Sequence, residues 1–505
     1  IRTYLETGQA APFVSYDLTD PSSGQYTYPT AWHQLAALLI TTGVTSSIPV
    51  AQNALMLAVT ALAWPASVFF WVRSIFRSGP ALLLGTGVLA AGFAAYPFLL
   101  ASYGPLHPYQ LGLSMLPFGV GLVLRALRLG VAPATHWLTL ATLGVIYLGA
   151  ALIAHPNSVL GWMAISVSLL IALIVREIWR LRQGSVERRP ALRNVAIASL
   201  IIVAGVIIWG QMRPGEHWWA PPVTMPQAFG EFWLAGPMNR PAALAIGLLV
   251  ATALVMIIRS GRDLMLLAPT AMLLVLYLAA TSFLNFDLRH LLTGGFYNDP
   301  ARLGALIPMA LLPLALLPLT KADQWLESRS FTPVQQLALL SAGTILLTWA
   351  TQVDRNVREE VWNIADAYRV HPRSRELTTY ELQMLRDLPK FVSPGDIVVA
   401  DTLTGAGFMY ALEGLHPIQY HPKEALSEAE EFLLLHLSDP AMEAEVCHAV
   451  SQSSADFVLD FGTEQINMDL EHKPPVGLQN LDDSPVLTQV HQVGVTRLFE
   501  ITGCP

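Results

Sequence analysis

Asp299 and Arg302 stand about one helical turn apart, directly before an apolar run that begins at Leu303. A guanidinium group binds phosphate through paired N–H donors, and a nearby carboxylate can hold that group in place. Because Asp299 precedes Pro300, the pattern also fits a helix cap with proline at the first helical position and a local ion pair. We expect Arg302 to bind an anion and Asp299 to fix its side chain, with a purely structural cap as the alternative.

Histidines and aromatic residues occur at the ends of other apolar segments. Tyr28 and His33 lie in "YTYPTAWHQLAALL", His107 lies in "YGPLHPYQ", and His155 lies in "AHPNS". Tyrosine and tryptophan also favour the membrane–water interface for reasons unrelated to function. Together with an arginine, however, such side chains suit a ligand that carries phosphate and sugar. We therefore predict substrate-binding roles for Tyr28, His33, His107 and His155.

The apolar segments that must position these residues are long. The chain has 505 residues, of which 53% are hydrophobic and 13% are charged. A soluble protein carries about 25% charged residues, and a membrane-spanning helix needs roughly 20 apolar residues. We expect about ten spans, all helical because lipid offers no hydrogen-bond partner to the backbone. They cover residues 49–72, 80–102, 107–125, 135–154, 157–178, 194–210, 241–258, 264–283, 301–319 and 334–352.

The basic residues orient these spans. If residues 1–48 lie outside, the inner loops hold 14 Lys and Arg residues and the outer side of the membrane region holds 5. Such a bias is typical of cytoplasmic loops. The polar clusters described above then all fall on the outer side, whereas interface anchoring would decorate both sides. One-sided polar loops predict a binding or active cavity that opens outward.

Residues 354–505 differ from the rest of the chain. They hold 25 of the 37 acidic residues and 10 of the 29 basic ones, which gives this tail a formal charge of −15. Segments such as "DIVVAD" and "DFVLDFG" predict strands, and "EAEEFLLLHLSD" predicts a helix. We expect an extracytoplasmic α/β domain at 354–505, after a transmembrane domain at 49–353 and an outer region at 1–48. Asp401 and Asp460 would end strands of this domain, either as part of a site or as solvated strand ends.

The tail contains the two cysteines of the chain, Cys447 and Cys504. An outer compartment permits disulfides, and a bond between them would tie down the C-terminus. Two free thiols are the alternative, because spacing alone does not fix the geometry.

Motifs of soluble nucleotide-using enzymes are absent from the sequence. It has no phosphate-binding Walker loop, no dinucleotide fingerprint, no H-E-x-x-H and no nucleophile elbow. The energy for a reaction would then have to come with the substrate, as in a lipid-phosphate-linked sugar whose phosphate is the leaving group. The sequence identifies no cofactor and leaves a divalent metal ion open.

Several segments carry a resemblance to a known family. "IRTYLETGQAAP", "YGPLHPYQLGLSMLP", "GGFYNDPARLGALIPMALLP" and the ending "EVCHAV…DFVLDFG…TRLFEITGC" resemble an uncharacterised actinobacterial family of multi-span membrane proteins related to the GT-C glycosyltransferases. The resemblance implies a catalytic Asp or Glu in the first outer loop, at a position that we expect upstream of Ile1. Asp17 and Asp20 lie in the same loop, but outside the expected motif, and are not assigned as the base.

These observations and the resemblance together predict a GT-C-like α-helical polytopic protein of the plasma membrane, with a C-terminal extracytoplasmic α/β domain. The resemblance implies a glycosyltransferase that uses a polyprenyl-phosphate sugar on the outer face to build cell-envelope glycan. Its partners would be membrane lipid, the sugar donor and a glycan acceptor, without nucleic acid. The alternative is a non-catalytic transporter of lipid-linked glycan or a cell-envelope scaffold. A transporter should have polar groups near mid-membrane and repeated halves, and the sequence has no evident internal repeat.

Overall fold

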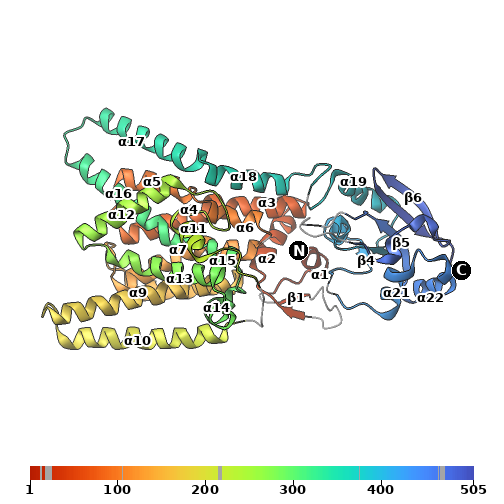
Figure 1. Ribbon diagram of the computed structural model, residues 1–505, viewed down its shortest axis with the longest axis horizontal. Coiled ribbons are helices and arrows are strands. Elements are labelled where there is room, and N and C mark those ends of the chain that lie inside the picture. The colour runs from red at the N-terminus through yellow and green to blue at the C-terminus, as the bar shows by residue number, and fades with distance from the viewer. Residues whose placement is uncertain are drawn as a thin grey trace. The chain divides into compact units, whose positions relative to one another are not determined.

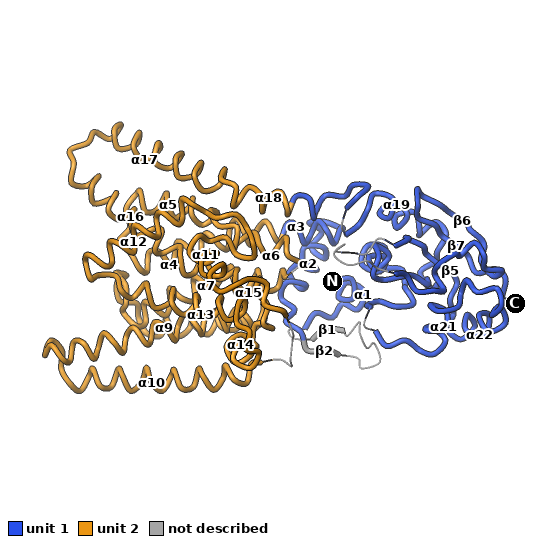
Figure 2. Tube along the Cα trace, viewed as in Figure 1, with its two compact units in different colours: residues 1–54, 365–505 blue, residues 55–364 orange. Residues whose placement is uncertain are grey.

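The computed structural model describes all 505 residues except 12–13, 17–24, 105, 214–218, 375, 423, 464–465, 467–472 and 505, and it leaves the side chains of 14–16 and 25–27 undescribed. The chain forms two compact units, one of residues 55–364 and one of residues 1–54 with 365–505 (Figure 2). We expected residues 1–48 to belong with the membrane helices and the tail to begin near residue 354. In the structure, residues 1–54 pack with the tail, and the second boundary follows residue 364.

Hydrogen bonds explain why the N-terminal segment joins the tail. Helix α1 (Arg2–Thr7) lies beside α20 (Met409–Glu413). The Arg2 guanidinium donates to the backbone carbonyl oxygens of Ala411 at 3.1 Å and Leu412 at 2.8 Å. The Tyr410 hydroxyl donates to the Glu6 carboxylate at 2.7 Å. These bonds satisfy carbonyl groups at the end of α20 that have no partner within their own helix.

The unit of residues 55–364 is helical. Within the described residues, eight helices are long and apolar enough to cross a membrane, or nine if one bent pair counts as a span (Figure 1). The eight are α3–η2–α4 (Ile48–Ile75), α7 (His107–Leu127), α8 (Trp137–Ala154), α9 (Pro156–Arg182), α10 (Arg188–Gln211), η4–α13 (Leu264–Ser282), α15–α16 (Pro300–Glu327) and α17–η6 (Pro333–Val353). The bent pair joins α5 (Pro80–Ala90) to η3–α6 (Ala94–Ser102) at 42°, and α12 (Leu244–Ser260) is a shorter apolar helix. Each of the ten predicted ranges therefore coincides with a helical segment, which agrees with a multi-pass membrane protein.

Burial separates central helices from peripheral ones. In the most apolar window of α15–α16, 83% of the residues are buried inside the protein, whereas the corresponding shares are 11% in α10 and 6% in α17–η6. A helix that is hydrophobic all round must be covered on all sides. Neighbouring helices cover α15–α16. The apolar side chains of α10 and α17 remain exposed, as expected of helices that face lipid.

A carboxylate from α16 caps the start of α5. Asp323 accepts hydrogen bonds from the backbone N–H groups of Ala81 at 2.7 Å and Leu82 at 3.0 Å. Asp323 is 6% exposed, so these bonds also satisfy a charge held away from water. Gly79 leaves room for this carboxylate, because a Cβ atom at that position would lie 2.2 Å from Asp323 Cγ.

We expect Gly79→Ala to displace the Asp323 carboxylate and break both bonds to the start of α5. Each bond to a charged group contributes about 1.5–3 kcal/mol, so the variant should lose about 2 kcal/mol or more of stability. The apparent melting temperature of the detergent-solubilised protein measures this loss. Gly144→Ala is the matched control, since a Cβ atom there meets nothing within 4 Å. Equal melting temperatures for the two variants would contradict the capping role.

The other unit contains a five-stranded mixed sheet in the order β4-β3-β5-β7-β6. Its strands are β3 (Ile397–Ala400), β4 (His416–Pro417), β5 (Ala455–Asp460), β6 (Leu487–Val493) and β7 (Thr496–Ile501). Strands β4, β3 and β5 run parallel, and β7 and β6 continue the sheet in antiparallel fashion. The predicted C-terminal α/β organisation is confirmed at this level, although the sequence analysis had not identified β6.

Helices cover both faces of this sheet. Because successive side chains of a strand point to opposite faces, Leu498 and Phe499 of β7 enter different cores. Leu498 packs with Met384 of α19 (Thr379–Asp387), near α20. Phe499 packs with Leu433 of α21 (Glu428–His436), next to α22 (Glu443–Ser453). A smaller two-stranded sheet, β1 (Val14–Tyr16) with β2 (Gln25–Thr27), lies in the N-terminal segment.

Cys447 of α22 and Cys504, which follows β7, form a disulfide with an S–S distance of 2.03 Å. The predicted pairing is confirmed. The bond joins positions separated by 57 residues and fastens the C-terminal segment to α22.

We expect both cysteines to resist maleimide in the native protein and in the unfolded, unreduced protein, and to react once a reductant is added. Closing a loop of this length stabilises the fold by about 4 kcal/mol in the chain-entropy model, so the reduced protein should also melt at a lower temperature. Mass spectrometry counts the labelled thiols. Labelling of both cysteines in the untreated protein would contradict the disulfide.

Candidate functional site

Four segments from three distant parts of the sequence meet at one end of the helical unit. They are the end of α6, the beginning of α7, the turn between α8 and α9, and the segment from α14 (Phe286–Thr293) through η5 (Gly294–Phe296) to α15 (Pro300–Gly304). The last segment turns sharply, since Tyr297 and Asn298 both adopt positive φ. Such backbone is uncommon outside glycine, and here it directs Asp299 and Arg302 toward the other segments.

Asp299 is both a helix cap and the partner of Arg302. One carboxylate oxygen accepts the backbone N–H of Ala301 at 2.8 Å, and the other accepts Nε of Arg302 at 3.2 Å. The cap and the ion pair that were one interpretation of the sequence are therefore both present. Burial raises the pKa of the Asp299 carboxyl, while the positive charge of Arg302 opposes this rise.

Three more residues contact Arg302, two of them at its guanidinium. Its Nη1 atom donates to the side-chain amide oxygen of Asn157 at 3.1 Å, in the amide orientation that also lets Asn157 donate to the Gly295 carbonyl at 3.3 Å. The ring of Tyr297 lies 4.6 Å from Cζ. The Tyr109 hydroxyl donates to the Arg302 carbonyl at 3.0 Å and so anchors the backbone. Asp299 and Asn157 thus engage Nε and Nη1 of the guanidinium. Within the described part of the chain, no acceptor bonds to Nη2.

His155 faces the same guanidinium. Its Nδ1 atom accepts the backbone N–H of Asn157 at 3.1 Å, which caps α9. Burial, aided by the positive charge of Arg302, lowers the pKa of His155 to about 3, so the ring is neutral at pH 7 and carries its proton on Nε2. Nε2 lies 3.4 Å from Nη1 of Arg302. Because both groups are donors, they do not satisfy each other. An acceptor oxygen that faces both nitrogens at about 2.9 Å would receive both N–H groups.

The structure brings together three of the six predicted site residues, His155, Asp299 and Arg302. His107 begins α7 and is buried, two positions before Tyr109. Tyr28 and His33 lie in the other compact unit, with their ring centroids 5.7 Å apart. A role for these three residues in binding the same substrate as Arg302 stays a prediction. Asp17 and Asp20 fall outside the described residues.

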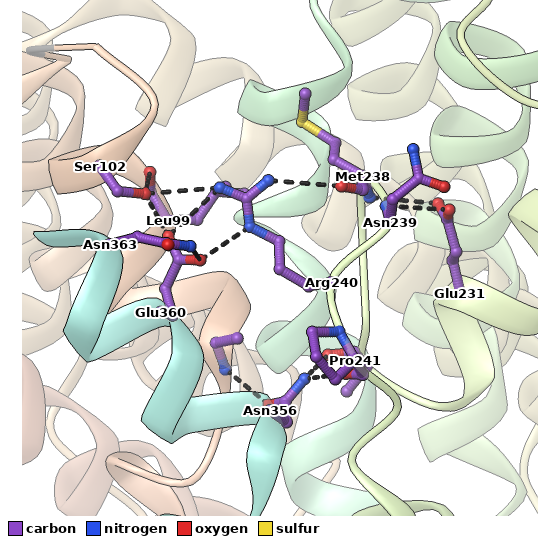
Figure 3. Close-up of polar contacts among 12 residues, drawn as sticks. Leu99, Ser102, Glu231, Met238, Asn239, Arg240, Pro241, Asn356, Glu360 and Asn363 are labelled. Atoms are coloured by element: carbon purple, nitrogen blue, oxygen red, sulfur yellow. Dashed lines mark hydrogen bonds and ion pairs between the residues drawn. The ribbon is translucent and has the colours of Figure 1, made fainter.

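A second buried ion pair joins Arg240 to Glu360 (Figure 3). Nε and Nη2 of Arg240 donate to the two carboxylate oxygens of Glu360, at 2.9 and 3.2 Å. The Ser102 hydroxyl contacts Glu360 and lies 3.4 Å from Nη2. The Glu360 side chain is fully buried. Such a bidentate pair fixes both partners in orientation.

The loop that carries Arg240 is held from two sides. Glu231 of α11 (Met225–Trp233) accepts the backbone N–H groups of Met238 at 3.2 Å and Asn239 at 3.1 Å, both of which adopt positive φ. Asn356 of α18 (Arg355–Tyr368) donates to the Ala235 carbonyl at 3.2 Å and also bonds to the Pro241 carbonyl. These bonds fix the loop backbone on both sides of Arg240.

Tyr103 connects the two ion pairs. It follows Ser102, and burial together with the negative charge of Asp299 raises the pKa of its hydroxyl, which therefore remains a donor. Arg302 and Arg240 both act on it electrostatically. Tyr103 lies in the same polar turn as His107, but no binding role was predicted for it. Glu360 was not identified from the sequence. Glu360 was missed because the charge shift at residue 354 assigned it to the tail, whereas its contacts are with the helical unit.

The composition of the site limits its chemistry. It combines two arginines, a neutral histidine, tyrosines and amides. Its two carboxylates, Asp299 and Glu360, are already paired with Arg302 and Arg240. No group of three or more His, Cys, Asp or Glu side chains suited to a metal ion is found among the residues that the structure describes. The arrangement fits recognition of an oxyanion by N–H donors.

Comparison with known proteins adds one relationship. No curated protein matches this sequence. A protein-family model matches residues 1–503, nearly the entire chain. The chain therefore belongs to the family described as a family of unknown function, DUF6541.

Proposed function

We propose that this protein is a membrane glycosyltransferase of the GT-C type, which takes a sugar from a polyprenyl-phosphate donor on the outer face and adds it to a cell-envelope glycan. The observation that carries this proposal is the pair of convergent donors, Nη1 of Arg302 and Nε2 of His155, 3.4 Å apart. A phosphate oxygen that faces both nitrogens would accept both N–H groups.

In the proposed reaction, an acceptor hydroxyl oxygen forms a bond to the anomeric carbon of the sugar while the bond from that carbon to the phosphate oxygen breaks. The hydroxyl proton passes to a general base, and the electron pair of the broken bond stays on the polyprenyl phosphate. Arg302 and His155 stabilise the charge that develops on the leaving phosphate. Donors fixed before the reaction are effective because they do not have to reorganise during it.

The surroundings of the pair support a lipid-linked substrate. His155 caps the start of α9 and Arg302 lies in α15, and both helices belong to segments with the length and composition of membrane spans. A phosphate bound there would leave its polyprenyl chain next to apolar helix surfaces. The disulfide in the tail supports an extracytoplasmic location for that unit, since such bonds persist in oxidising compartments.

A second candidate is a protein that binds the lipid-linked sugar without transferring it. It is favoured by the state of Asp299, whose two carboxylate oxygens are occupied by Ala301 and Arg302. A carboxylate so engaged positions the arginine and does not serve as the general base. The Arg302 site by itself is then sufficient for binding, and the base for transfer is not assigned to it.

Both candidates can be tested with the full chain in proteoliposomes. The probe is a radiolabelled polyprenyl-phosphate sugar, and polyprenyl alcohol serves as the control without phosphate. We expect saturable binding that depends on the phosphate, followed by release of free polyprenyl phosphate when a cell-envelope glycan fraction is added. Binding without release would favour the second candidate. Equal binding of the phosphate and the alcohol would contradict both.

A further inference from the structure

A cavity of about 500 Å³ opens beside the carboxyl ends of β3 and β4 in the unit that contains the tail. Cavities that hold small ligands fall in the range of roughly 300–1,000 Å³. In open α/β sheets, ligands bind outside the carboxyl ends of parallel strands, where the chain leaves the sheet and side chains converge. The cavity and the sheet topology therefore indicate the same position for a site.

Polar side chains at this position are held in place before any ligand arrives. Thr402, next to Asp401 at the end of β3, donates its hydroxyl to the Gln419 side-chain oxygen at 3.2 Å. Gln419 follows β4, and its amide nitrogen donates to the backbone carbonyl of Glu424 at 3.3 Å. The Glu424 carboxylate in turn accepts the backbone N–H of Tyr420 at 2.5 Å. All except Tyr420 line the cavity.

The charges of the lining select the class of ligand. Asp401, Glu424 and Glu431 bring three carboxylates to the cavity, and Lys473 brings one ammonium group. Phosphates and other anions would be repelled. Burial raises the pKa of Glu424, so this group is less readily ionised than a free glutamate.

The remaining wall is apolar. Leu403, Leu426, Leu434 and Leu435 line it together with two prolines. A surface that combines carboxylates, an amide and a hydroxyl with an apolar wall matches a neutral sugar, which has hydroxyl groups around its ring and C–H groups on its faces. Apolar pocket walls with a few placed polar groups are typical of small-ligand sites.

The second strand-end carboxylate singled out by the sequence, Asp460, does not line the cavity. Asp460 accepts Nε and Nη2 of Arg497 at 3.0 and 2.7 Å and the backbone N–H of Gly462 at 2.9 Å. The Asp460 carboxylate therefore stabilises the fold by these contacts. Of the two aspartates, only Asp401 lines the cavity.

We propose that this cavity binds a neutral sugar residue of a glycan chain. The groups that hydrogen-bond its hydroxyls are the side chains of Asp401, Gln419, Glu424 and Glu431. The site would hold the glycan acceptor of the proposed transferase, and in that respect it rests on the proposed function. Sugar binding in the cavity itself requires neither Arg302 nor transfer.

The full chain in detergent is the protein for the test, and the probes are neutral oligosaccharides released from cell-envelope glycan. Saturation-transfer NMR and titration report binding. We expect Gln419→Leu to weaken binding about tenfold, because one lost hydrogen bond contributes about 1.4 kcal/mol at most in this setting. Glu431→Gln, on the exposed side of α21, should weaken binding several-fold without a risk to folding.

Gln489→Leu, on the exposed strand β6, is the matched control and should bind as the wild type does. Arg302→Ala should also retain oligosaccharide binding, which separates this site from the proposed transferase site. Absence of saturable binding to the wild type would overturn the proposal, as would wild-type affinity in both Gln419→Leu and Glu431→Gln. Tighter binding of phosphorylated than of neutral oligosaccharides would overturn the assignment of ligand class.

Discussion

Arg302→Lys should reduce sugar transfer by about 100-fold or more, comparable with the loss of one donor from an oxyanion-binding site. Lysine keeps the positive charge, but it cannot donate to Asp299 through Nε and to Asn157 through Nη1 while still presenting a donor beside His155. The fork of the guanidinium makes that combination possible. Because the lost donor acts on charge that develops during the reaction, the effect should fall on turnover more than on donor binding.

The measurement is release of polyprenyl phosphate from the radiolabelled donor in proteoliposomes, at saturating and at limiting donor. Arg213→Lys is the control, since Arg213 bonds the Gly210 carbonyl near the end of α10 at 3.1 Å and no other group among the residues that the structure describes. Both variants should be present in the membrane at wild-type amounts. Unchanged turnover in Arg302→Lys would rule out the phosphate-binding role of this residue.

Arg240→Ala should destabilise the helical unit by about 3–5 kcal/mol, because it leaves a buried carboxylate without its partner. Glu360 is fully buried and receives two N–H groups from Arg240. The contacts with Ser102 and Asn363 would remain, but both groups are neutral and cannot balance that charge. The apparent melting temperature and the fraction of protein that survives gel filtration in detergent report the loss.

The matched control is an ion pair on α18, the helix that carries Glu360. Arg355 pairs with Glu359 in α18, and the Arg355 side chain is 70% exposed. Exposed pairs contribute little to stability, so Arg355→Ala should melt close to the wild type. Adding Glu360→Gln to Arg240→Ala removes the unpaired charge and should recover part of the stability. An Arg240→Ala variant as stable as Arg355→Ala would show that Glu360 is not dependent on its arginine.

The features that were predictable are those encoded in local patterns. Apolar stretches of sufficient length identified the helical segments, because burial of the backbone in lipid leaves few alternatives. Asp299 before Pro300 identified the cap of α15, because both residue types favour those positions. The charge shift separated the tail from the helices, and the placement of the cysteines led to the disulfide.

The features that were missed depend on contacts between distant segments. Glu360 lies among acidic residues typical of the tail, and only its bonds to Arg240 reveal that it belongs with the helices. Asn157 and Tyr103 become part of the site through partners in other segments. Strand β6 has exposed side chains on both faces and therefore lacks the alternation that identifies a half-buried strand. Residues 1–54 join the tail through bonds from α1 to α20, which no local pattern encodes.

The cap that His155 provides for α9 has a consequence for the acidity that the site tolerates. Because Nδ1 accepts the backbone N–H of Asn157 at the start of α9, the ring proton must be on Nε2 whether or not a substrate is bound. A histidine with a pKa near its usual value would gain a proton as the surroundings acidify through about pH 6. With a pKa of about 3, His155 keeps the same protonation state from mildly acidic to alkaline surroundings. The proposed donor would therefore keep its proton over that whole range of pH.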